Sequence, residues 1–355
     1  MRRRRFLSGV GAASVGGLAG CLGFELQSGD SVRGEPDMVE DRPDAAYMPT
    51  HVEGMAVAGT QSSGAYDCAL TYTYPHRFWQ VTGTHTSMTE VTEGDTVHLM
   101  PVVWHRETGI VPPDVNPGFE VSLEGGSVVS RSPWSMLSQR MGFHFGDNVV
   151  LPGENTYDVT VSVGEPSAMR TGSLADAGPA EFEFEFTFPR SELETVSYRD
   201  IPADEEGTRG AVDPMNMEMV PTTQLVEPDA LPGTVRGTAK SGDATLAVTT
   251  LDDATPFGGD ESETYLAVSA RTPYNRYPLP MMSLSGTLVR GGETVFDDSL
   301  TTALDADLGT HYGAPVPGVE SGDELTLSVD APPQVARHEG YETAFLSMPA
   351  ATLTL

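Results

Sequence analysis

The segment 181–188 limits the possible folds most tightly, because its apolar and polar residues alternate without a break. Phe182, Phe184, Phe186 and Phe188 are separated by two glutamates and a threonine. Successive side chains of a strand point to opposite faces, so the pattern places all four rings on one face. It therefore predicts a half-buried antiparallel strand whose other face is in contact with solvent.

Other segments have the same strand character, and none has a long helical period. They are 66–74, 96–104, 156–163 and 181–188 in the first half, and 244–250, 264–270, 283–288 and 324–329 in the second. The 38 glycines and 27 prolines interrupt the chain at short intervals, as turns do between the strands of a sandwich. We therefore expect an all-β protein built from antiparallel β-sandwiches.

A short segment occurs twice. His144 begins His-Phe-Gly-Asp-Asn-Val, and His311 begins His-Tyr-Gly-Ala-Pro-Val; a Pro-Gly pair and a strand pattern follow each. The offset of 311 − 144 = 167 residues is about one domain, which predicts an internal duplication. We expect a β-sandwich at 46–190, a Met-containing linker at 191–232, and a second, divergent sandwich at 233–355.

The N-terminus has the pattern of an export signal. A run of arginines at 2–5 precedes a short apolar stretch that ends in Leu-Ala-Gly-Cys at Cys21. The arginines resemble the twin-arginine export motif, and the last four residues resemble a lipoprotein processing box. We expect a signal at 1–21, a lipid on Cys21 and a flexible tether at 22–45, although an uncleaved anchor helix is the alternative. Cys68 would then be the remaining cysteine, which excludes an intramolecular disulfide.

Acidic residues dominate the charge, with 51 Asp and Glu against 20 Lys and Arg. A surface of this kind repels phosphate, so we exclude a nucleic-acid partner. Acid spread along the whole chain, with a single lysine at Lys240, is typical of a halophilic protein that carboxylates keep hydrated.

The sequence makes no positive case for an enzyme. It has no His-Glu-x-x-His pair, no Gly-x-Ser-x-Gly elbow and no glycine-rich phosphate loop. Cys68 lies within a strand pattern and is interpreted as a small buried residue. We therefore expect a binding protein.

The remaining candidates for function are side chains that can bind a metal ion. His51 and Glu53 would share a face if their segment is a strand, and Met136, Met141 and His144 cluster before the repeated His-aromatic-Gly turn. Imidazole with thioether suits copper, and a carboxylate extends the range to iron, manganese and zinc.

The segments 47–53 and 136–163 resemble the signature of the periplasmic iron-transport-associated proteins. That signature has a His-x-Glu element, a methionine, a His-Tyr-Gly turn and a Pro-Gly before a strand. The resemblance covers 45–190 and implies an immunoglobulin-like sandwich, dimers, divalent metal binding with copper prominent, and a membrane iron permease as partner. The family's ligands fall on His51, Glu53, Met136 and His144, with Met141 as a competing position for the methionine.

The second half matches the signature less well. His311 corresponds to the signature histidine, but Leu304 or its neighbour replaces the methionine. His338 lies in a segment that resembles the family's later Gly-Arg-His, where the first half has Met169 instead. Either the second domain is a degenerate copy, or the two domains pack as a built-in dimer. Met169, His311 and His338 are secondary candidate ligands.

Several other residues allow two interpretations. Met215, Met217 and Met219 alternate in the linker, as in copper(I)-handling motifs or as in an apolar stripe that packs on a sandwich. His76 lies in an aromatic turn and could line a pocket. His85, His98 and His105 lie in or near strands, and we interpret them as structural.

These features together predict an extracytoplasmic, lipid-anchored protein that binds copper, iron or a similar ion and assists iron uptake. Its partners would be the metal, the membrane and an iron permease, in a homodimer or an intramolecular pseudo-dimer. The alternative is a metal-free sandwich lipoprotein that binds a partner or has a structural role.

Overall fold

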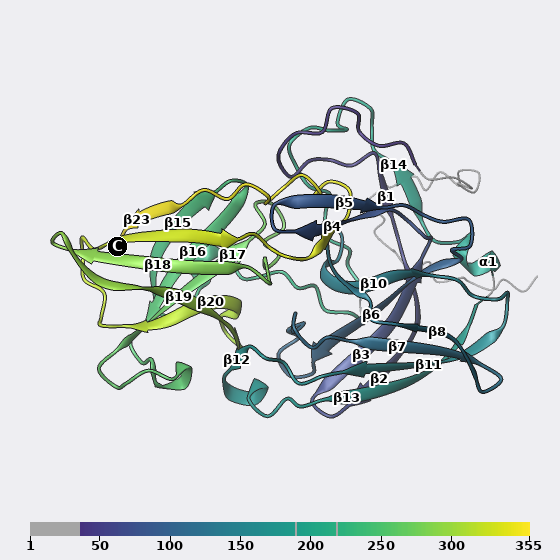
Figure 1. Ribbon diagram of the computed structural model, residues 1–355, viewed down its shortest axis with the longest axis horizontal. Coiled ribbons are helices and arrows are strands. Elements are labelled where there is room, and N and C mark those ends of the chain that lie inside the picture. Colours follow the sequence, from purple (N-terminus) through teal and green to yellow (C-terminus); the bar gives the residue numbers. More distant parts are fainter. Residues whose placement is uncertain (1–35, 189, 218) are drawn as a thin grey trace, which may run out of the picture.

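The structure is a computed structural model that describes residues 36–188, 190–217 and 219–355. Two β-rich halves lie next to each other in Figure 1, the first in blue to teal and the second in green to yellow. The all-β prediction is confirmed: strands make up nearly all the regular structure of the described chain. The predicted signal, Cys21 and the first part of the tether, 22–35, lie outside the described residues.

The first half contains two antiparallel sheets joined by one core. Its larger sheet has the order β2 (Ala56–Ser63), β3 (Tyr66–Thr73), β6 (Val97–His105), β10 (Gly142–Val149), β9 (Trp134–Ser138), β22 (Ala336–Arg337), β4 (Phe78–Thr82), β5 (His85–Thr89). The smaller sheet has the order β13 (Ala180–Thr187), β11 (Thr156–Val163), β7 (Gly118–Leu123), β8 (Gly126–Arg131). The alternating phenylalanines of β13 are buried in the core between the sheets, as predicted.

The second half forms one large, curled sheet. Its order is β15 (Thr234–Ser241), β16 (Ala244–Leu251), β17 (Thr264–Arg271), β20 (Gly309–Val316), β19 (Glu293–Asp305), β18 (Ser283–Arg290), β21 (Glu324–Ala331), β23 (Ala351–Thr354), with β12 (Met169–Arg170) added beside β19. Short 3₁₀ turns occur at Gly172–Leu174, Pro228–Ala230 and Thr255–Phe257.

The strand pairing repeats between the two halves. In the first half, Leu99 of β6 faces Asp147 of β10; in the second, Leu266 of β17 faces Ala314 of β20. Both members of the pair are displaced by the same 167 residues (266 − 99 and 314 − 147). The β2–β3 and β15–β16 hairpins also carry a bulge at the corresponding place. The duplication in the sequence therefore extends to the register of the sheets.

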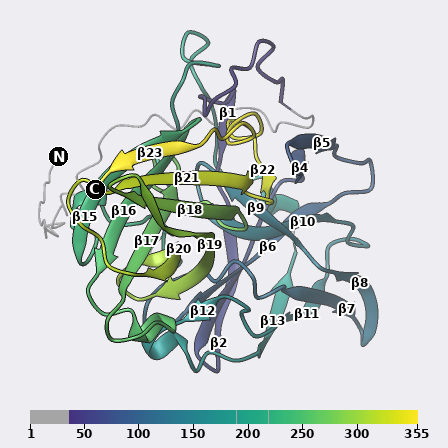
Figure 2. The same ribbon diagram turned by 60° about the vertical axis from the view of Figure 1, so that its left-hand side comes forward.

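Each half also gives a short strand to the other half. Ala336 of β22 pairs in parallel with Met136 of β9, and Met169 of β12 pairs in parallel with Ala303 of β19. The two exchanges are related by the same 167-residue offset (336 − 169 and 303 − 136). Figure 2 shows the yellow β22 beside β9 and β4. The exchange brings residues from the end of the chain into the sheet of the first half.

The linker and the end of the predicted tether are packed against this assembly. The linker starts in α1 (Arg190–Leu193) and continues into β14 (Tyr198–Asp200), which pairs with β1 (His51–Glu53). Within the segment expected to be a tether, the Pro43 carbonyl accepts a hydrogen bond of 2.8 Å from Thr343 Oγ1. The described part of this segment is therefore held by the C-terminal region. No helix within the described ranges is long and apolar enough to cross a membrane.

Candidate metal centre

Four histidine rings meet inside the first half. His76 precedes β4, His98 lies on β6, His144 lies on β10, and His338 follows the exchanged strand β22. The ring centroids are 4.1 Å apart for His76 and His98, 4.7 Å for His76 and His338, 5.1 Å for His144 and His338, and 6.3 Å for His98 and His338. His98 and His144 are fully buried. The sheet exchange is what brings the fourth ring to the other three.

Three of these rings are oriented by a hydrogen bond at Nδ1. The acceptors are the Tyr74 carbonyl for His76 at 3.0 Å, Asn148 Oδ1 for His98 at 2.8 Å, and the Gly142 carbonyl for His144 at 3.0 Å. A carbonyl oxygen only accepts, so Nδ1 carries the proton and donates it, which leaves the lone pair on Nε2. This is the arrangement in which outer hydrogen bonds orient metal-binding histidines.

The Nε2 atoms of all four rings are buried and have no hydrogen-bond partner among the described residues. A buried polar atom without a partner costs free energy on the order of 1–3 kcal/mol, so four at one place call for an explanation. An ion held tetrahedrally by imidazole nitrogens at about 2.0 Å would set neighbouring ring centres roughly 5 Å apart, which is within the observed range. The four measured ring spacings are therefore close to those around a single bound cation.

The four rings are not yet arranged as a complete set of metal ligands. In the described chain, no three His, Cys, Asp or Glu side chains already have the spacing of a metal site. His98 and His144 lie on strands and His76 and His338 lie in loops, so binding of an ion requires these four side chains to rearrange.

Burial keeps the four rings neutral. It lowers the pKa of His144 to about 4 and the pKa of His76 below its ordinary value. The pKa values of His98 and His338 lie well below the ordinary value, first because of burial and then because of the neighbouring histidines. Neutral imidazole is the form that binds a metal, so no proton has to be removed at neutral pH.

The glycine of the His-aromatic-Gly motif makes room for this cluster. A Cβ atom at Gly146 would overlap with His98 Nε2 and press on Met100 Cγ. Its backbone has no positive φ, so the requirement is for space and not for conformational freedom. Asn148, a residue of the same motif, contacts two of the histidines. Its Oδ1 accepts the hydrogen bond from His98 Nδ1, and its Nδ2 donates to the His76 carbonyl at 2.9 Å.

The Gly146→Ala substitution is therefore expected to displace the His98 ring. We expect it to lower the free energy of unfolding by about 1–3 kcal/mol, the usual cost of an overpacked core, and to weaken metal binding at the same time. Gly59→Ala is the matched control, since a Cβ there would meet Phe184 at an ordinary 3.5 Å. Urea unfolding and metal titration of both variants measure the two effects. Equal behaviour of the two variants would contradict the role given to Gly146.

Of the predicted methionines, Met136 lies beside the cluster. It is buried, faces His144 across the β9–β10 hairpin, and packs with Phe78 and Ala336. Directly opposite residues of an antiparallel pair share a face, so its thioether and the His144 imidazole are on the same side of the sheet. Met141 lies in the hairpin turn and lines a small cavity that also borders His144.

His51 and Glu53 share a face, as the sequence predicts for a strand. His51 Nε2 lies 3.6 Å from Glu53 Oε1, and the His51 ring stacks on Tyr198 at 5.2 Å. Neither side chain is in ring contact with the four histidines. Both are near enough for their charges to influence the pKa of His76, so they flank the cluster.

An ion pair closes the cluster on one side. Arg77 and Glu339 follow His76 and His338 directly in the sequence, and Arg77 Nη2 lies 3.2 Å from Glu339 Oε2. Both side chains are largely buried. The pair therefore joins the start of β4 to the end of the exchanged strand.

The second half has lost the corresponding cluster. His311 donates from Nδ1 to the Gly309 carbonyl at 2.9 Å, as His144 does to Gly142, but its Nε2 lies 3.0 Å from the Tyr265 hydroxyl. Tyr265 occupies the position of His98 (265 − 98 = 167), and Phe257 stacks on it at 3.7 Å. Both nitrogens of His311 are therefore bonded.

Two further positions differ in the second half: Ala303 stands where the first half has Met136, and Thr171 stands where His338 follows the exchanged strand (338 − 171 = 167). Ala303 pairs with His311, as Met136 pairs with His144. The residue in place of the signature methionine is therefore Ala303, the neighbour of Leu304. Met169 pairs with Ala303 and packs on an apolar cluster that includes Phe257 and Tyr265. Of the three secondary candidates, the structure thus places His338 at the first-half cluster and the other two in the second half.

The sequence interpretation missed His76 and His98 as possible ligands. The available signal was the 167-residue offset, which aligns His98 with Tyr265 and Gly146 with Gly313. A Cβ at Gly313 would overlap with the Tyr265 hydroxyl, so each glycine makes room for the ring on the neighbouring strand.

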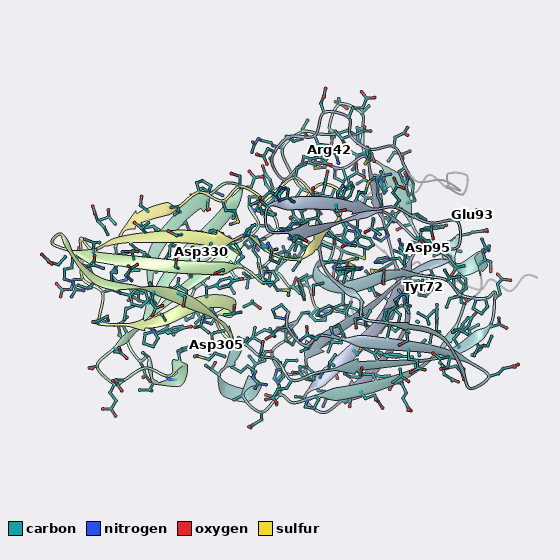
Figure 3. The ribbon with its side chains drawn as sticks, in the orientation of Figure 1. Arg42, Tyr72, Glu93, Asp95, Asp305 and Asp330 are labelled. Carbon is teal, nitrogen blue, oxygen red and sulfur yellow. The ribbon has the colours of Figure 1, made fainter. Side chains whose placement is uncertain are left out.

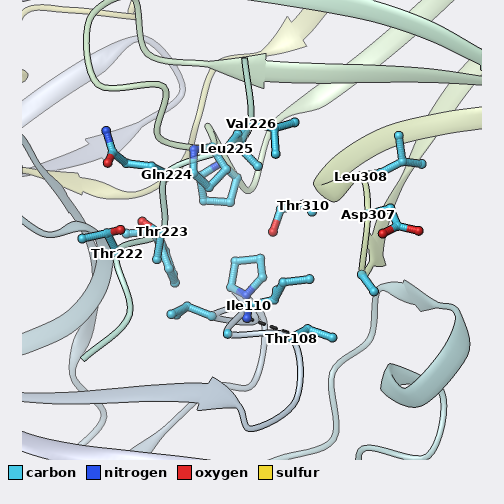
Figure 4. A pocket seen from close by; sticks show the side chains of 18 residues that line it. Thr108, Ile110, Thr222, Thr223, Gln224, Leu225, Val226, Asp307, Leu308 and Thr310 are labelled. Carbon is cyan, nitrogen blue, oxygen red and sulfur yellow. Dashed lines mark hydrogen bonds between the residues drawn. The ribbon is translucent and has the colours of Figure 1, made fainter. Parts of the chain in front are cut away.

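A different cavity lies between the halves and has a volume of about 220 Å³. Figure 4 shows that its labelled side chains are mainly threonines and aliphatic residues. Asp307 is the carboxylate among its lining residues, and none of the described residues that line it is a histidine. Figure 3 shows Asp305, labelled near the same boundary, where it accepts a hydrogen bond from Thr171 of the other half.

A family model matches part of the second half. A family described as a domain of unknown function, DUF7350, matches residues 229–354, which is less than half of the chain. No curated protein matches the chain.

Among solved structures, the chain is similar to FetP from uropathogenic Escherichia coli strain F11. A copper-bound FetP variant has 18% identity and a TM-score of 0.30, over 38% of this chain and 97% of FetP. FetP as isolated after recombinant expression in the periplasm has 17% identity and a TM-score of 0.28, over 39% and 95%. Similarity at this level does not establish a residue-by-residue correspondence.

Proposed function

We propose that the protein binds one transition-metal ion through His76, His98, His144 and His338. The observation that supports this is the set of four buried Nε2 atoms without a hydrogen-bond partner in the described chain. Imidazole suits copper, zinc, iron and nickel, and the Met136 thioether beside the rings shifts the preference toward copper. Of these four ligands, His144 was a primary candidate in the sequence and His338 a secondary one. His76 and His98 are additional ligands.

We further propose that the protein works outside the cytoplasmic membrane, anchored by a lipid on Cys21, and that it assists iron uptake beside a membrane permease. The N-terminal motif supports the export and the anchor, and the resemblance of 45–190 to iron-transport-associated proteins supports the pathway. His51 and Glu53 flank the cluster and would help to attract a cation.

Metal analysis of the purified protein tests this function. Protein exposed separately to Cu(II), Zn(II) and Fe(II), then desalted, should retain about one ion per chain, with copper retained best. A variant with His98→Asn and His144→Asn should retain none. His85→Asn is the control, because His85 is exposed on β5. If no ion is retained by the wild-type protein, the metal-free partner-binding module becomes the better account.

A further inference from the structure

A second, smaller cavity of about 20 Å³ borders the histidine cluster and is lined by three methionines. They are Met141, Met215 and Met217, and His144 and Arg140 also line it. The volume is close to that of one water-sized particle. The cavity therefore has room for a single ion.

The linker is held over the β9–β10 hairpin at this point. The Met215 amide donates to the Arg140 carbonyl at 2.8 Å, and Arg140 Nη1 donates to the Asp213 carbonyl at 2.9 Å. A Cβ at Gly142 would overlap with Thr223 Oγ1, so the following part of the linker also lies against the hairpin. These contacts place the linker methionines where they can face His144.

The two linker methionines that line the cavity alternate along the chain. Met215 and Met217 are half-buried, while Asn216 between them is exposed. Met219, the third methionine of the run, is 57% exposed and does not line the cavity. The segment thus directs two of its three thioethers inward, together with Met141 from the hairpin.

The neighbouring groups indicate which ion the cavity would take. Thioethers bind soft ions such as Cu(I), and none of the described residues that line the cavity is a carboxylate. Arg140 is also among the lining residues, and its positive charge would repel a doubly charged ion more strongly than a singly charged one. Both features favour a soft monovalent cation.

The cavity also borders the first ring of the cluster. His144 is fully buried, is among the residues that line the cavity, and has an Nε2 atom without a hydrogen-bond partner in the described chain. An ion held by the methionines would therefore be next to the first imidazole of the cluster.

We propose that Met141, Met215 and Met217 form a thioether entry site that receives a soft monovalent ion, Cu(I), and transfers it to His144. This inference rests on the proposed function, because it gives the route by which the four-histidine site is filled. The ion keeps its oxidation state, so the step exchanges ligands and requires no oxidant or reductant.

Silver(I), a redox-inert ion with the same preference for sulfur, tests the entry site. Protein labelled with ¹³C at the methionine methyl groups and ¹⁵N at histidine is titrated with silver nitrate in chloride-free buffer and followed by NMR. We expect the methyl resonances of Met141, Met215 and Met217 to shift, and the imidazole resonances to follow. A variant with all three methionines replaced by leucine should fill its histidine site at least tenfold more slowly in stopped-flow mixing. Its final affinity should be within about threefold of the wild-type value.

The control is Met88→Leu, which removes an exposed thioether on β5 that does not line the cavity. It should fill at the wild-type rate. A triple leucine variant that fills as fast as the wild type, or methyl resonances that stay unchanged while the imidazoles shift, would overturn the entry site. Methyl shifts without any imidazole shift would instead refute the proposed four-histidine function while supporting the thioether site, so the two failures are distinguishable.

Discussion

Replacing His338 by alanine is expected to lower the metal affinity of the first half by at least about 100-fold, although His338 lies close to the C-terminus. The expected loss exceeds the 10–100-fold that is typical when only an outer-shell partner of a metal site is removed. The reason is geometric: β22 is inserted between β9 and β4, so the ring stands 4.7 Å from His76 and 5.1 Å from His144. Competition with a chromophoric copper chelator measures the affinity.

His311→Ala is the matched control for this experiment. His311 is also buried and also donates from Nδ1 to a strand carbonyl, but its Nε2 is bonded to Tyr265. Its removal should leave the metal affinity unchanged within about twofold and lower the stability by about 1–3 kcal/mol, because the Tyr265 hydroxyl loses its partner. If His311→Ala weakened metal binding as much as His338→Ala, the assignment of the site to the first half would be wrong.

The metal-free protein is expected to lose most of its stability as the pH falls from about 6.5 to about 4. Burial lowers the pKa of His144 and of His311 to about 4 in the folded state, from an ordinary value near 6.5. In this window the unfolded chain binds more protons than the folded chain, so stability rises with pH and is lost on acidification. Each of the two residues contributes roughly 3 kcal/mol by the usual conversion, against a typical total of about 5–15 kcal/mol.

Urea unfolding at several pH values between 7 and 4, with and without bound metal, checks this expectation. His144→Asn removes one of the titrating groups and should flatten the pH dependence of the unfolding midpoint. Metal should raise the midpoint most at neutral pH, where it binds neutral imidazole. A midpoint that does not move in the metal-free protein would show that these rings are protonated without cost, and therefore not buried as described.

Local pattern was sufficient to predict the strands. The segment 156–163 was expected as a strand from its alternating apolar residues and is β11, and 181–188 corresponds to β13 within one residue. The period of two is a property of neighbouring residues, so it can be seen without knowledge of the partners. The 167-residue repeat was visible for the same reason, because a duplication keeps similar residues at a constant offset.

The site was only partly predictable. His144 and Met136 belong to one hairpin and were found from a local motif, whereas His98 had no distinguishing neighbours in its strand. Its role depends on the pairing of β6 with β10, which sets Asn148 opposite His98. The meeting of His338 with these rings depends on the exchange of β22, a contact between distant parts of the chain that no periodicity encodes.

Among the described residues, only the first half has such a cluster. The two halves exchange short strands, so a residue of one half can lie at a site in the other. In the second half, Tyr265 replaces the histidine at the position of His98, and its hydroxyl bonds to His311. The position that corresponds to His338 is Thr171 (338 − 171 = 167), which donates to Asp305. The equivalent positions of the second half thus form hydrogen bonds and apolar contacts.

Copper K-edge anomalous diffraction from a crystal of the copper-loaded protein tests the central claim most directly. The account predicts one strong peak per chain among His76, His98, His144 and His338, with imidazole nitrogens at about 2.0 Å. A peak bound elsewhere, or a loaded crystal whose four Nε2 atoms remain unligated, would contradict it.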